Sequence, residues 1–372
     1  MKPALSQARR LLVKIGSALL VEASGEIRQS WLERLADDLA QLRRQGMEVL
    51  VVSSGAIAVG RRRLGLAAPA LKLEEKQAAA ATGQIRLAHA YQAALARHDI
   101  TVAQILLTLE DTEERRRHLN ARQTLATLLR LGALPVINEN DTVATSEIRF
   151  GDNDRLAARV AAMIGADTLV LLSDIDGLYT ADPRQDAGAR HLALVERITP
   201  EVEAMAGATA NSYASGGMVT KLAAAKVAVG AGCRMAIADG RAVGALGALA
   251  DGGKATWFLA EITPMTARKR WIQGSLKPRG SVTLDAGALN ALRAGKSLLP
   301  AGVTQVEGRF ERGDLVLVLD PAGREVARGL SAYGAADAER IRGHRSREIE
   351  ALIGYRGREE LIHRDDLVLT GE

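Results

Sequence analysis

Short apolar runs alternate with helix-length stretches over about the first 260 residues, and no other feature of the chain restricts its fold as much. The runs are continuous rather than interrupted at every second position, which is typical of strands buried on both faces. Repeated strand and helix favour an α/β fold with a mostly parallel sheet between helices. We predict strands at 11–15, 49–53, 101–107, 134–137, 168–172 and 234–238, and helices at 31–45, 72–97, 115–131, 154–164 and 218–231.

The pattern changes after about Pro264, where a basic stretch at 268–274 has the character of a connector. Short β-like runs with glycine turns follow at 280–284, 302–310, 315–319 and 325–330, with helices at 288–294 and 345–352. We therefore predict a first domain at 1–264, a linker at 265–280 and a small, mostly β domain at 281–372, which is a normal size for an independent unit.

Composition indicates which residues build the core and in which compartment the protein works. Only 3% of the residues are aromatic, so Ala, Leu, Val and Ile must build the core. The single cysteine, Cys233, rules out an internal disulfide, fits a reducing compartment and is expected to be a small buried apolar residue. The chain has neither an apolar run of about 20 residues nor an N-terminal signal pattern. These features predict a cytoplasmic protein with no membrane segment.

The charge is uneven along the chain. The region from Ser281 onward carries 13 Lys and Arg and 15 Asp and Glu, a net charge of −2, whereas the whole chain has +5. The basic excess therefore lies in the first 280 residues and suits a small anionic ligand better than a long nucleic acid. An arginine cluster leaves RNA binding by the second domain open as a weak alternative, although such a cluster is more often a solvated helix face. It comprises Arg340, Arg342, Arg345 and Arg347.

Polar clusters follow several of the predicted strands. Since ligands bind outside the carboxyl ends of parallel strands, these clusters are candidate site residues. The first, 14–17, contains a lysine that needs an anion if it is buried, and the second, 53–60, is either an anion site or a plain helix cap. The third consists of 138–141 and 151–154, which are rich in Asn and Asp, and the fourth is 173–180.

The stretch Ala214-Ser-Gly-Gly-Met-Val-Thr-Lys221 places two glycines and a lysine at the start of a predicted helix. Helix-start amides bind phosphate oxygens, and glycine lets the ligand approach closely. Together with Lys14 and the carboxylates, this pattern indicates phosphoryl transfer, which requires charge neutralisation more than a covalent group. The sequence has no P-loop, protein kinase or dinucleotide-binding motif and no zinc spacing, and we assign no metal ligand and no catalytic histidine.

These motifs, in their order and spacing, resemble the glutamate 5-kinase family, which joins an amino acid kinase domain to a C-terminal PUA domain. The resemblance covers nearly the whole chain. Its motifs are 13–17, 54–58, 135–141, 151–154, 178–183 and 216–221 in the first domain, and 297–302, 310–313 and 363–366 in the PUA part. It implies a three-layer sandwich around a mostly parallel sheet, followed by a PUA-like domain.

The resemblance also implies ATP-dependent phosphorylation of the L-glutamate side-chain carboxylate, the first step of proline biosynthesis. It assigns catalysis to Lys14, Asp154 and Lys221. It assigns glutamate binding to Ser54, Asn138, Asp141 and Asn153. It assigns ATP binding to Lys14, Ser173, Asp174, Ser215, Gly216, Gly217, Met218, Val219, Thr220 and Lys221. Mg²⁺ is expected on the nucleotide phosphates, proline is a possible inhibitor at the glutamate site, and a homo-oligomer, either dimer or tetramer, is expected.

Two positions depart from the family pattern. The nucleotide loop begins Ala214-Ser215 where Gly-Thr is usual, and Ser173 stands where Thr is expected. The first change removes a glycine's conformational freedom and bears on ATP affinity more than on the reaction. Three alternatives stay open at this stage: another amino acid kinase, such as an aspartate or uridylate kinase; an RNA-binding protein; and a catalytically inactive regulator, which the presence of Lys14, Asp154 and Lys221 disfavours.

Overall fold

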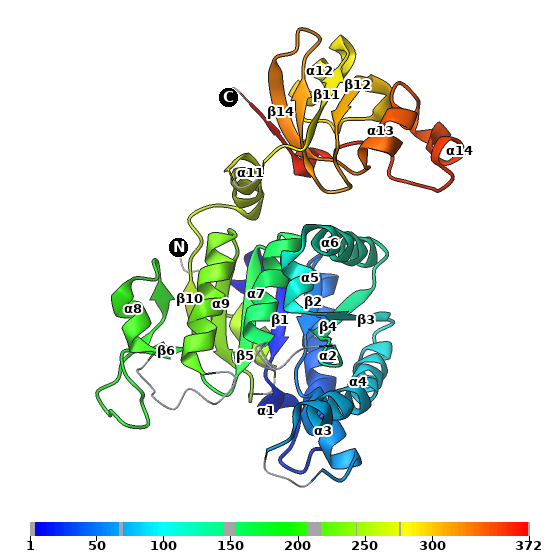
Figure 1. The fold of residues 1–372 in the computed structure, drawn as a ribbon. Coiled ribbons are helices and arrows are strands. Elements are labelled where there is room, and N and C mark those ends of the chain that lie inside the picture. The colour runs from blue at the N-terminus through cyan, green and yellow to red at the C-terminus, as the bar shows by residue number, and fades with distance from the viewer. Residues whose placement is uncertain are drawn as a thin grey trace. The chain divides into compact units, whose positions relative to one another are not determined.

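The computed structural model describes residues 4–66, 70–143, 153–206, 217–242, 244–274 and 277–370. The chain forms two compact units, Met1–Pro264 and Met265–Glu372 (Figure 1). None of the helices in the described part combines the length and apolarity needed to cross a bilayer. Each unit is described separately below.

An eight-stranded sheet forms the centre of the first unit, as far as the described residues extend. Neighbouring strands are parallel except at the β9–β10 pair. The strand order is β3 (Val102–Leu107), β4 (Leu134–Glu139), β2 (Glu48–Val52), β1 (Arg10–Ile15), β5 (Thr168–Ser173), β9 (Arg234–Asp239), β10 (Ala255–Phe258) and β8 (Leu194–Val195). The mostly parallel α/β fold is thus confirmed. The sequence analysis missed β8 and β10, and also the two-residue hairpin strands β6 (Leu178–Tyr179) and β7 (His191–Leu192).

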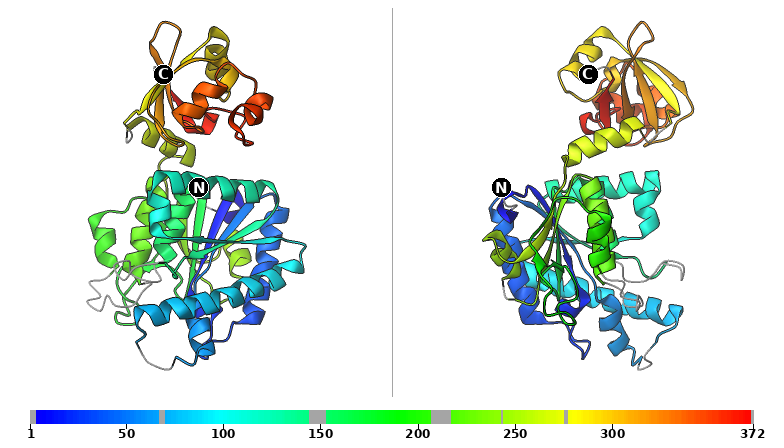
Figure 2. Two further views of the ribbon diagram at one scale, coloured as in Figure 1. Left: turned by 45° about the vertical axis from the view of Figure 1, so that its right-hand side comes forward. Right: turned by 90° about the vertical axis from the view of Figure 1, so that its left-hand side faces the viewer.

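The sheet is buried on both faces because successive strand residues pack in opposite directions. Leu11 and Val13 belong to one core cluster, together with residues of α2 and α4, whereas Leu12 belongs to the cluster on the other face, with α7 and α9. The right-hand view of Figure 2 shows helices on the two sides of the sheet. Cys233 is fully buried in the second of these clusters, as expected.

In the described part of the first unit, the five predicted helices are found to within a few residues, and five shorter helices (α1, α3, α5, α8 and α10) accompany them. The bounds are α1 (Ser17–Leu20), α2 (Gln29–Arg44), α3 (Ala56–Arg63), α4 (Leu73–Ala96), α5 (Leu109–Glu113), α6 (Arg115–Arg130), α7 (Asn153–Ile164), α8 (Pro200–Met205), α9 (Met218–Gly230) and α10 (Ala245–Ala250). Helices α3 and α4 are in direct backbone contact, because Gly60 faces Ala79 and Gly83 faces Ala56.

The second unit is built on a five-stranded sheet with the order β12 (Val303–Gly308), β11 (Gly280–Leu284), β13 (Leu315–Leu319), β14 (Glu325–Leu330) and β15 (Leu367–Leu369). All four predicted β runs correspond to strands: 280–284, 315–319 and 325–330 coincide with β11, β13 and β14, and 302–310 contains β12. Helices α12 (Ala286–Arg293), α13 (Ala335–Ile341) and α14 (Ile349–Ile353) complete the unit.

The stretch predicted as a connector is helical, since α11 spans Pro264–Gly274. Arg268 of this helix forms a buried ion pair with Asp366, with 2.5 Å between Nη2 and Oδ1. A residue of α11, Ile272, is also fully buried. Helix α11 is therefore fixed to the second unit and grouped with it.

Candidate active site

The predicted site residues come together at the edge of the sheet formed by the carboxyl ends of β1, β2, β4 and β5. Lys14 is the last residue but one of β1, and Ser54 lies two residues beyond β2. Asn138 is the last residue but one of β4, and Ser173 is the last residue of β5. The parallel arrangement brings these positions to one edge, and α7 and α9 begin at the same edge.

Asp154 lies between two lysines. Its Oδ1 is 2.5 Å from Lys14 Nζ, and its Oδ2 is 3.1 Å from Lys221 Nζ. The side chains are almost inaccessible, with exposed fractions of 1% for Asp154, 8% for Lys14 and 3% for Lys221. Residues from β1, α7 and α9, more than 200 positions apart at the extremes, thus share one buried ionic cluster.

The charges of this cluster fit it to an anion. Burial alone would raise the pKa of Asp154, but the charges of Lys14 and Lys221 outweigh burial and hold that pKa below its ordinary value. One carboxylate between two ammonium groups leaves a net positive charge in a nearly water-free place. An anionic group such as a phosphoryl oxygen would balance that charge.

Helix α9 begins beside this cluster. Within the part of the chain that the structure describes, its N-cap, Gly217, has extended backbone and no side-chain cap, so the first-turn amides can donate to a ligand. A side chain at Gly217 would meet none of the described atoms within 4 Å. The Thr220 hydroxyl donates to the Gly217 carbonyl (2.7 Å) and lies 3.4 Å from Asp154 Oδ2. Ser215 and Gly216, also predicted for this loop, lie outside the described residues, as does Ala214.

Ser173 and Asp174 occupy the carboxyl end of β5. Ser173 is buried, and its hydroxyl donates to Asp174 Oδ1 at 3.1 Å, whereas Asp174 is exposed. The Ser173 carbonyl accepts from Gly240 N (2.8 Å), which connects this loop to the end of β9. Gly240 was not among the predicted residues, although its position two residues after a predicted strand, 234–238, was the available signal.

Asn153, next to Asp154, binds the other half of the site. Its Nδ2 donates to the Ser53 carbonyl (2.8 Å), to Ser54 Oγ (2.8 Å) and to Asn138 Oδ1 (3.0 Å). The predicted residues Ser54, Asn138 and Asn153 are therefore in contact. The start of α7 joins them to the ionic cluster through a single peptide bond.

Gln84 of α4 is a further member of this network that sequence reasoning missed. Its Oε1 accepts a hydrogen bond of 2.7 Å from Asn138 Nδ2. The available signal was a polar side chain on the buried face of a helix, between the buried residues Ala80 and Leu87.

Asp141, two residues beyond β4, is 8% exposed. Burial, together with the smaller effect of the nearby charge of Glu139, raises the pKa of Asp141 to about 7. A buried carboxylate of this kind gains most when a cation approaches, because the cation offsets both effects. The site therefore has a carboxyl group suited to an ammonium ligand.

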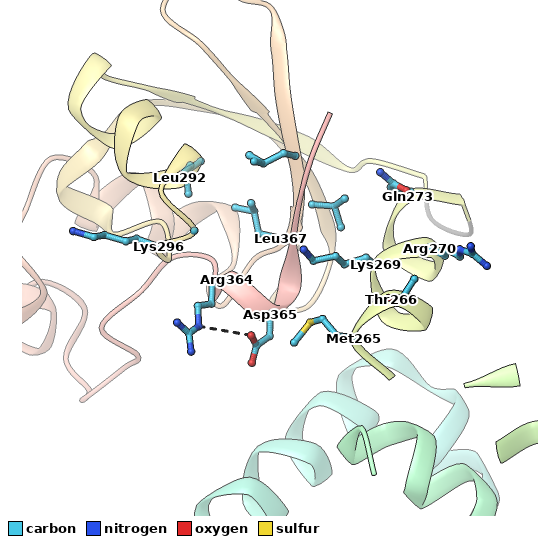
Figure 3. A pocket seen from close by; sticks show the side chains of 13 residues that line it. Met265, Thr266, Lys269, Arg270, Gln273, Leu292, Lys296, Arg364, Asp365 and Leu367 are labelled. Atoms are coloured by element: carbon cyan, nitrogen blue, oxygen red, sulfur yellow. Dashed lines mark ion pairs between the residues drawn. The ribbon is translucent and has the colours of Figure 1, made fainter. Parts of the chain in front are cut away.

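A separate hollow of about 630 Å³ lies within the second unit, between α11 and β15 (Figure 3). Its lining mixes apolar side chains such as Leu292 and Leu367 with cations. In Figure 3, Lys296 and Arg270 point to opposite sides, and Arg364 is paired with Asp365 at 3.8 Å. The cations do not converge on one point as a phosphate site requires, so we assign this hollow no part in the reaction.

Two protein families match the chain, one in each of its two units. The amino acid kinase family matches residues 9–239, and the PUA domain family matches residues 280–353. The first match spans more than half of the chain and includes all the site residues predicted from the sequence, from Lys14 to Lys221. The fold and the match together place the chain in the amino acid kinase family.

Relatives that match almost the whole chain show to which group of amino acid kinases it belongs. The glutamate 5-kinase of Paramagnetospirillum magneticum is 65% identical over 368 residues, which cover 99% of each chain. The glutamate 5-kinase of Agrobacterium fabrum is 58% identical, covering 99% of this chain and 94% of its own. That of Dinoroseobacter shibae is 60% identical, covering 98% and 99%. The chain belongs to the glutamate 5-kinases that carry a C-terminal PUA domain, and the resemblance predicted from its motifs is confirmed.

Proposed function

We propose that the protein transfers the γ-phosphoryl group of ATP to the side-chain carboxylate of L-glutamate and forms L-glutamyl 5-phosphate, the first step of proline biosynthesis. One observation carries the proposal. Asp154 binds the two lysines of an anion site, while the adjacent Asn153 binds Ser54 of a second polar site. The start of α7 thus sets a phosphoryl site beside a substrate site. The names of the relatives support glutamate and ATP as the two substrates.

The reaction requires little covalent chemistry from the protein. A glutamate carboxylate oxygen forms a bond to the γ-phosphorus, the bond from that phosphorus to the β–γ bridging oxygen breaks, and ADP leaves. The carboxylate is already ionised, so no general base has to remove a proton. In our proposal Lys14 and Lys221 stabilise the charge on the transferring group, and Asp154 holds both lysines in place.

The two substrates occupy different parts of the site in this proposal. ATP is bound by Ser173, Asp174 and the segment 215–221, with phosphate oxygens at the open start of α9. Glutamate is bound by Ser54, Asp141 and Asn153, with Asn138 beside them. The raised pKa of Asp141 supports its pairing with the substrate ammonium, because a cation there relieves the unfavourable burial of the carboxylate.

We propose that Mg²⁺ is held by the phosphates of ATP rather than by a protein cage. Both oxygens of Asp154 are engaged by lysines. The part of the chain that the structure describes has no group of three or more His, Cys, Asp or Glu placed to hold a metal. Mg²⁺ often keeps few protein ligands when it binds with nucleotide phosphates, where it neutralises their charge.

The domain division, the oligomeric state and regulation are also proposals. We propose a catalytic domain at 1–264, a connection at 265–280 and a PUA-like domain at 281–372; the two compact units support this division, although α11 is fixed to the second. We further propose a homo-oligomer, dimer or tetramer, and proline inhibition at the glutamate site. Light scattering after size exclusion, and assays at rising proline concentration, test these two points.

Two alternatives are less well supported. An aspartate or uridylate kinase would share the fold, but the relatives with high identity are glutamate 5-kinases. RNA binding through the PUA-like domain is disfavoured by the net charge of −2 from Ser281 onward. Filter binding across a salt series tests it, since RNA retention must then fall with salt.

The decisive experiment measures ATP- and Mg²⁺-dependent formation of γ-glutamyl hydroxamate by the purified protein. L-Aspartate and uridylate serve as control acceptors. Activity with L-glutamate alone is the expected result. Phosphoryl transfer to a control acceptor instead of glutamate would leave the fold assignment intact and refute the proposed substrate.

A further inference from the structure

Asn153 holds a buried acceptor that has no partner among the residues that the structure describes. The residue is 4% exposed, and its Oδ1 makes no hydrogen bond to any of them. Buried polar atoms without partners are rare in folded proteins, and each one calls for an explanation. Its place at the start of α7, beside Asp154 and in contact with Ser54, puts this oxygen in the proposed glutamate site.

The orientation of the Asn153 amide follows from its other contacts. The Ser53 carbonyl can only accept, so the group that faces it at 2.8 Å must be the amide nitrogen. The oxygen must then point to the other side. Asn138 is oriented in the same way, because Glu139 N donates to its Oδ1 at 2.9 Å and thereby turns its Nδ2 toward Gln84.

Gln84 completes this chain of amides. Its Oε1 accepts from Asn138 Nδ2 (2.7 Å), and Asn138 Oδ1 accepts from Asn153 Nδ2 (3.0 Å). Both polar groups of Asn138 are therefore engaged within the protein. Asn138 therefore orients Asn153 rather than contacting a ligand itself, and Asn153 Oδ1 is the atom placed to accept a hydrogen bond from the ligand.

The backbone beneath Gln84 is held tightly. A Cβ atom at the preceding residue, Gly83, would lie 1.9 Å from the Ala56 carbonyl oxygen, so α4 is pressed directly against α3. Helix α3 begins two residues after Ser54, another contact of Asn153. The Gln84 side chain therefore extends from a rigid base, which is what a positioning residue requires.

The chemistry of the unpartnered oxygen identifies the ligand group. An amide oxygen only accepts hydrogen bonds, so its partner must be a donor. At neutral pH both carboxylates of glutamate are ionised and only accept, which leaves the α-ammonium group as the donor. We propose that Gln84, through Asn138, positions Asn153 Oδ1 to bind the α-ammonium group of the amino acid substrate. This assignment rests on the proposed function and adds Gln84 to its site.

The test compares two substitutions at Gln84 with two acceptors. Gln84→Met keeps the length of the side chain but removes the acceptor, whereas Gln84→Glu keeps an acceptor oxygen for Asn138. ADP release is measured with L-glutamate and with glutarate, which lacks only the α-amino group. We expect Gln84→Met to raise the KM for glutamate about tenfold, with kcat within about twofold and the KM for ATP unchanged. The activity with glutarate should stay the same, so the preference for glutamate should fall by the same factor.

Gln92→Met is the matched control, because Gln92 lies on the same helix and is exposed. It should leave both acceptors unaffected, and Gln84→Glu should restore most of the preference for glutamate. An equal loss with glutamate and glutarate, an unchanged KM in Gln84→Met, or no restoration by Gln84→Glu would overturn the proposal. If the unsubstituted protein releases no ADP with glutamate, the proposed function itself fails, which is a distinguishable result.

Discussion

Asn153 and Asp154 are consecutive residues at the start of α7, yet their side chains bind opposite halves of the site. Asp154 contacts Lys14 and Lys221 at 2.5 and 3.1 Å, while Asn153 contacts Ser54 Oγ at 2.8 Å. In the proposed reaction, adjacent residues of one helix therefore set the distance between the phosphoryl group and its acceptor. Substitutions around Asp154 should therefore affect phosphoryl transfer, whereas substitutions around Asn153 should affect substrate binding.

Replacement of Lys221 should abolish turnover but spare glutamate binding. In Lys221→Ala, and in Lys221→Met, which keeps the aliphatic stem, the transferring group loses one of two cations. We expect kcat to fall by about a hundredfold or more, the loss typical of removing one stabilising donor. Calorimetric titration should give an unchanged Kd for glutamate.

The control for this prediction is Lys226→Ala. Lys226 lies on the same helix but is about half exposed and pairs with Glu203. Its loss should not alter kcat. Normal turnover in Lys221→Ala would refute the phosphoryl role of Lys221.

Replacement of Asp154 should destabilise the first unit strongly. Asp154→Asn keeps the shape of the side chain but leaves two buried ammonium groups without a countercharge. The expected loss is about 3–5 kcal/mol in the free energy of unfolding, measured by urea denaturation. Glu203→Gln removes an exposed ion pair with Lys226 and should cost less than about 1 kcal/mol. Similar losses in both variants would show that the buried cluster is not the stabilising unit described here.

The pKa of Asp141 predicts a pH dependence. Because that pKa is about 7 in the free protein, kcat/KM for glutamate should fall as the pH falls through about 7, where the carboxylate becomes protonated and loses its attraction for the ammonium. Glu139→Gln removes one cause of the raised pKa and should move this limb of the profile to lower pH. Asp141→Asn should remove the limb and raise the KM for glutamate. A pH profile that does not move in Glu139→Gln would show that the limb does not arise from the raised pKa of Asp141.

The same shift makes a prediction for stability. The folded pKa of Asp141 is about 7, above its ordinary value of 3.8, so below about pH 4 both the folded and the unfolded chain keep the proton and the group has no effect on stability. Stability is then lost as the pH rises from about 4 to about 7, because over this range the unfolded chain ionises the carboxyl while burial keeps it protonated in the folded chain. Asp141→Asn should therefore be more stable than the unsubstituted protein at pH 8 and equally stable, with respect to this group, at pH 4. Urea unfolding at the two pH values measures the difference.

The contact between α3 and α4 should not tolerate a methyl group. In Gly83→Ala the new Cβ would lie 1.9 Å from the Ala56 carbonyl oxygen, so the helices must move apart. We expect a loss of about 1–3 kcal/mol or more in the free energy of unfolding. Gly230→Ala adds the same methyl at the end of α9, where none of the described atoms lies within 4 Å of it, and should be neutral or slightly stabilising. Equal thermal unfolding of both variants would contradict the direct helix contact.

Much of the fold followed from the sequence because its signal is local. The apolar runs that predicted β1, β2, β4, β5 and β9 are continuous and long enough to be read without knowing their neighbours. The hairpin strands β6 and β7, of two residues each, are too short to show a period, and their pairing depends on a distant partner. The segment at 268–274 was interpreted as a connector because it is basic and polar. It is helical, and its packing includes the ion pair of Arg268 with Asp366, almost a hundred residues away.

The sequence by itself determined which side chains could serve the site, since strand ends and helix starts carry Lys14, Ser54, Asn138, Asn153, Asp154 and Lys221, and parallel strands direct their ends to one edge. Only the tertiary structure decided how these side chains pair. It placed one carboxylate between two lysines and added Gln84 from the middle of a helix. It also left the amide oxygen of Asn153 without a partner in the described part of the chain. The reason is physical: residue type sets what a group can donate, accept or neutralise, whereas burial and distance, which arise from packing between remote segments, set what it does.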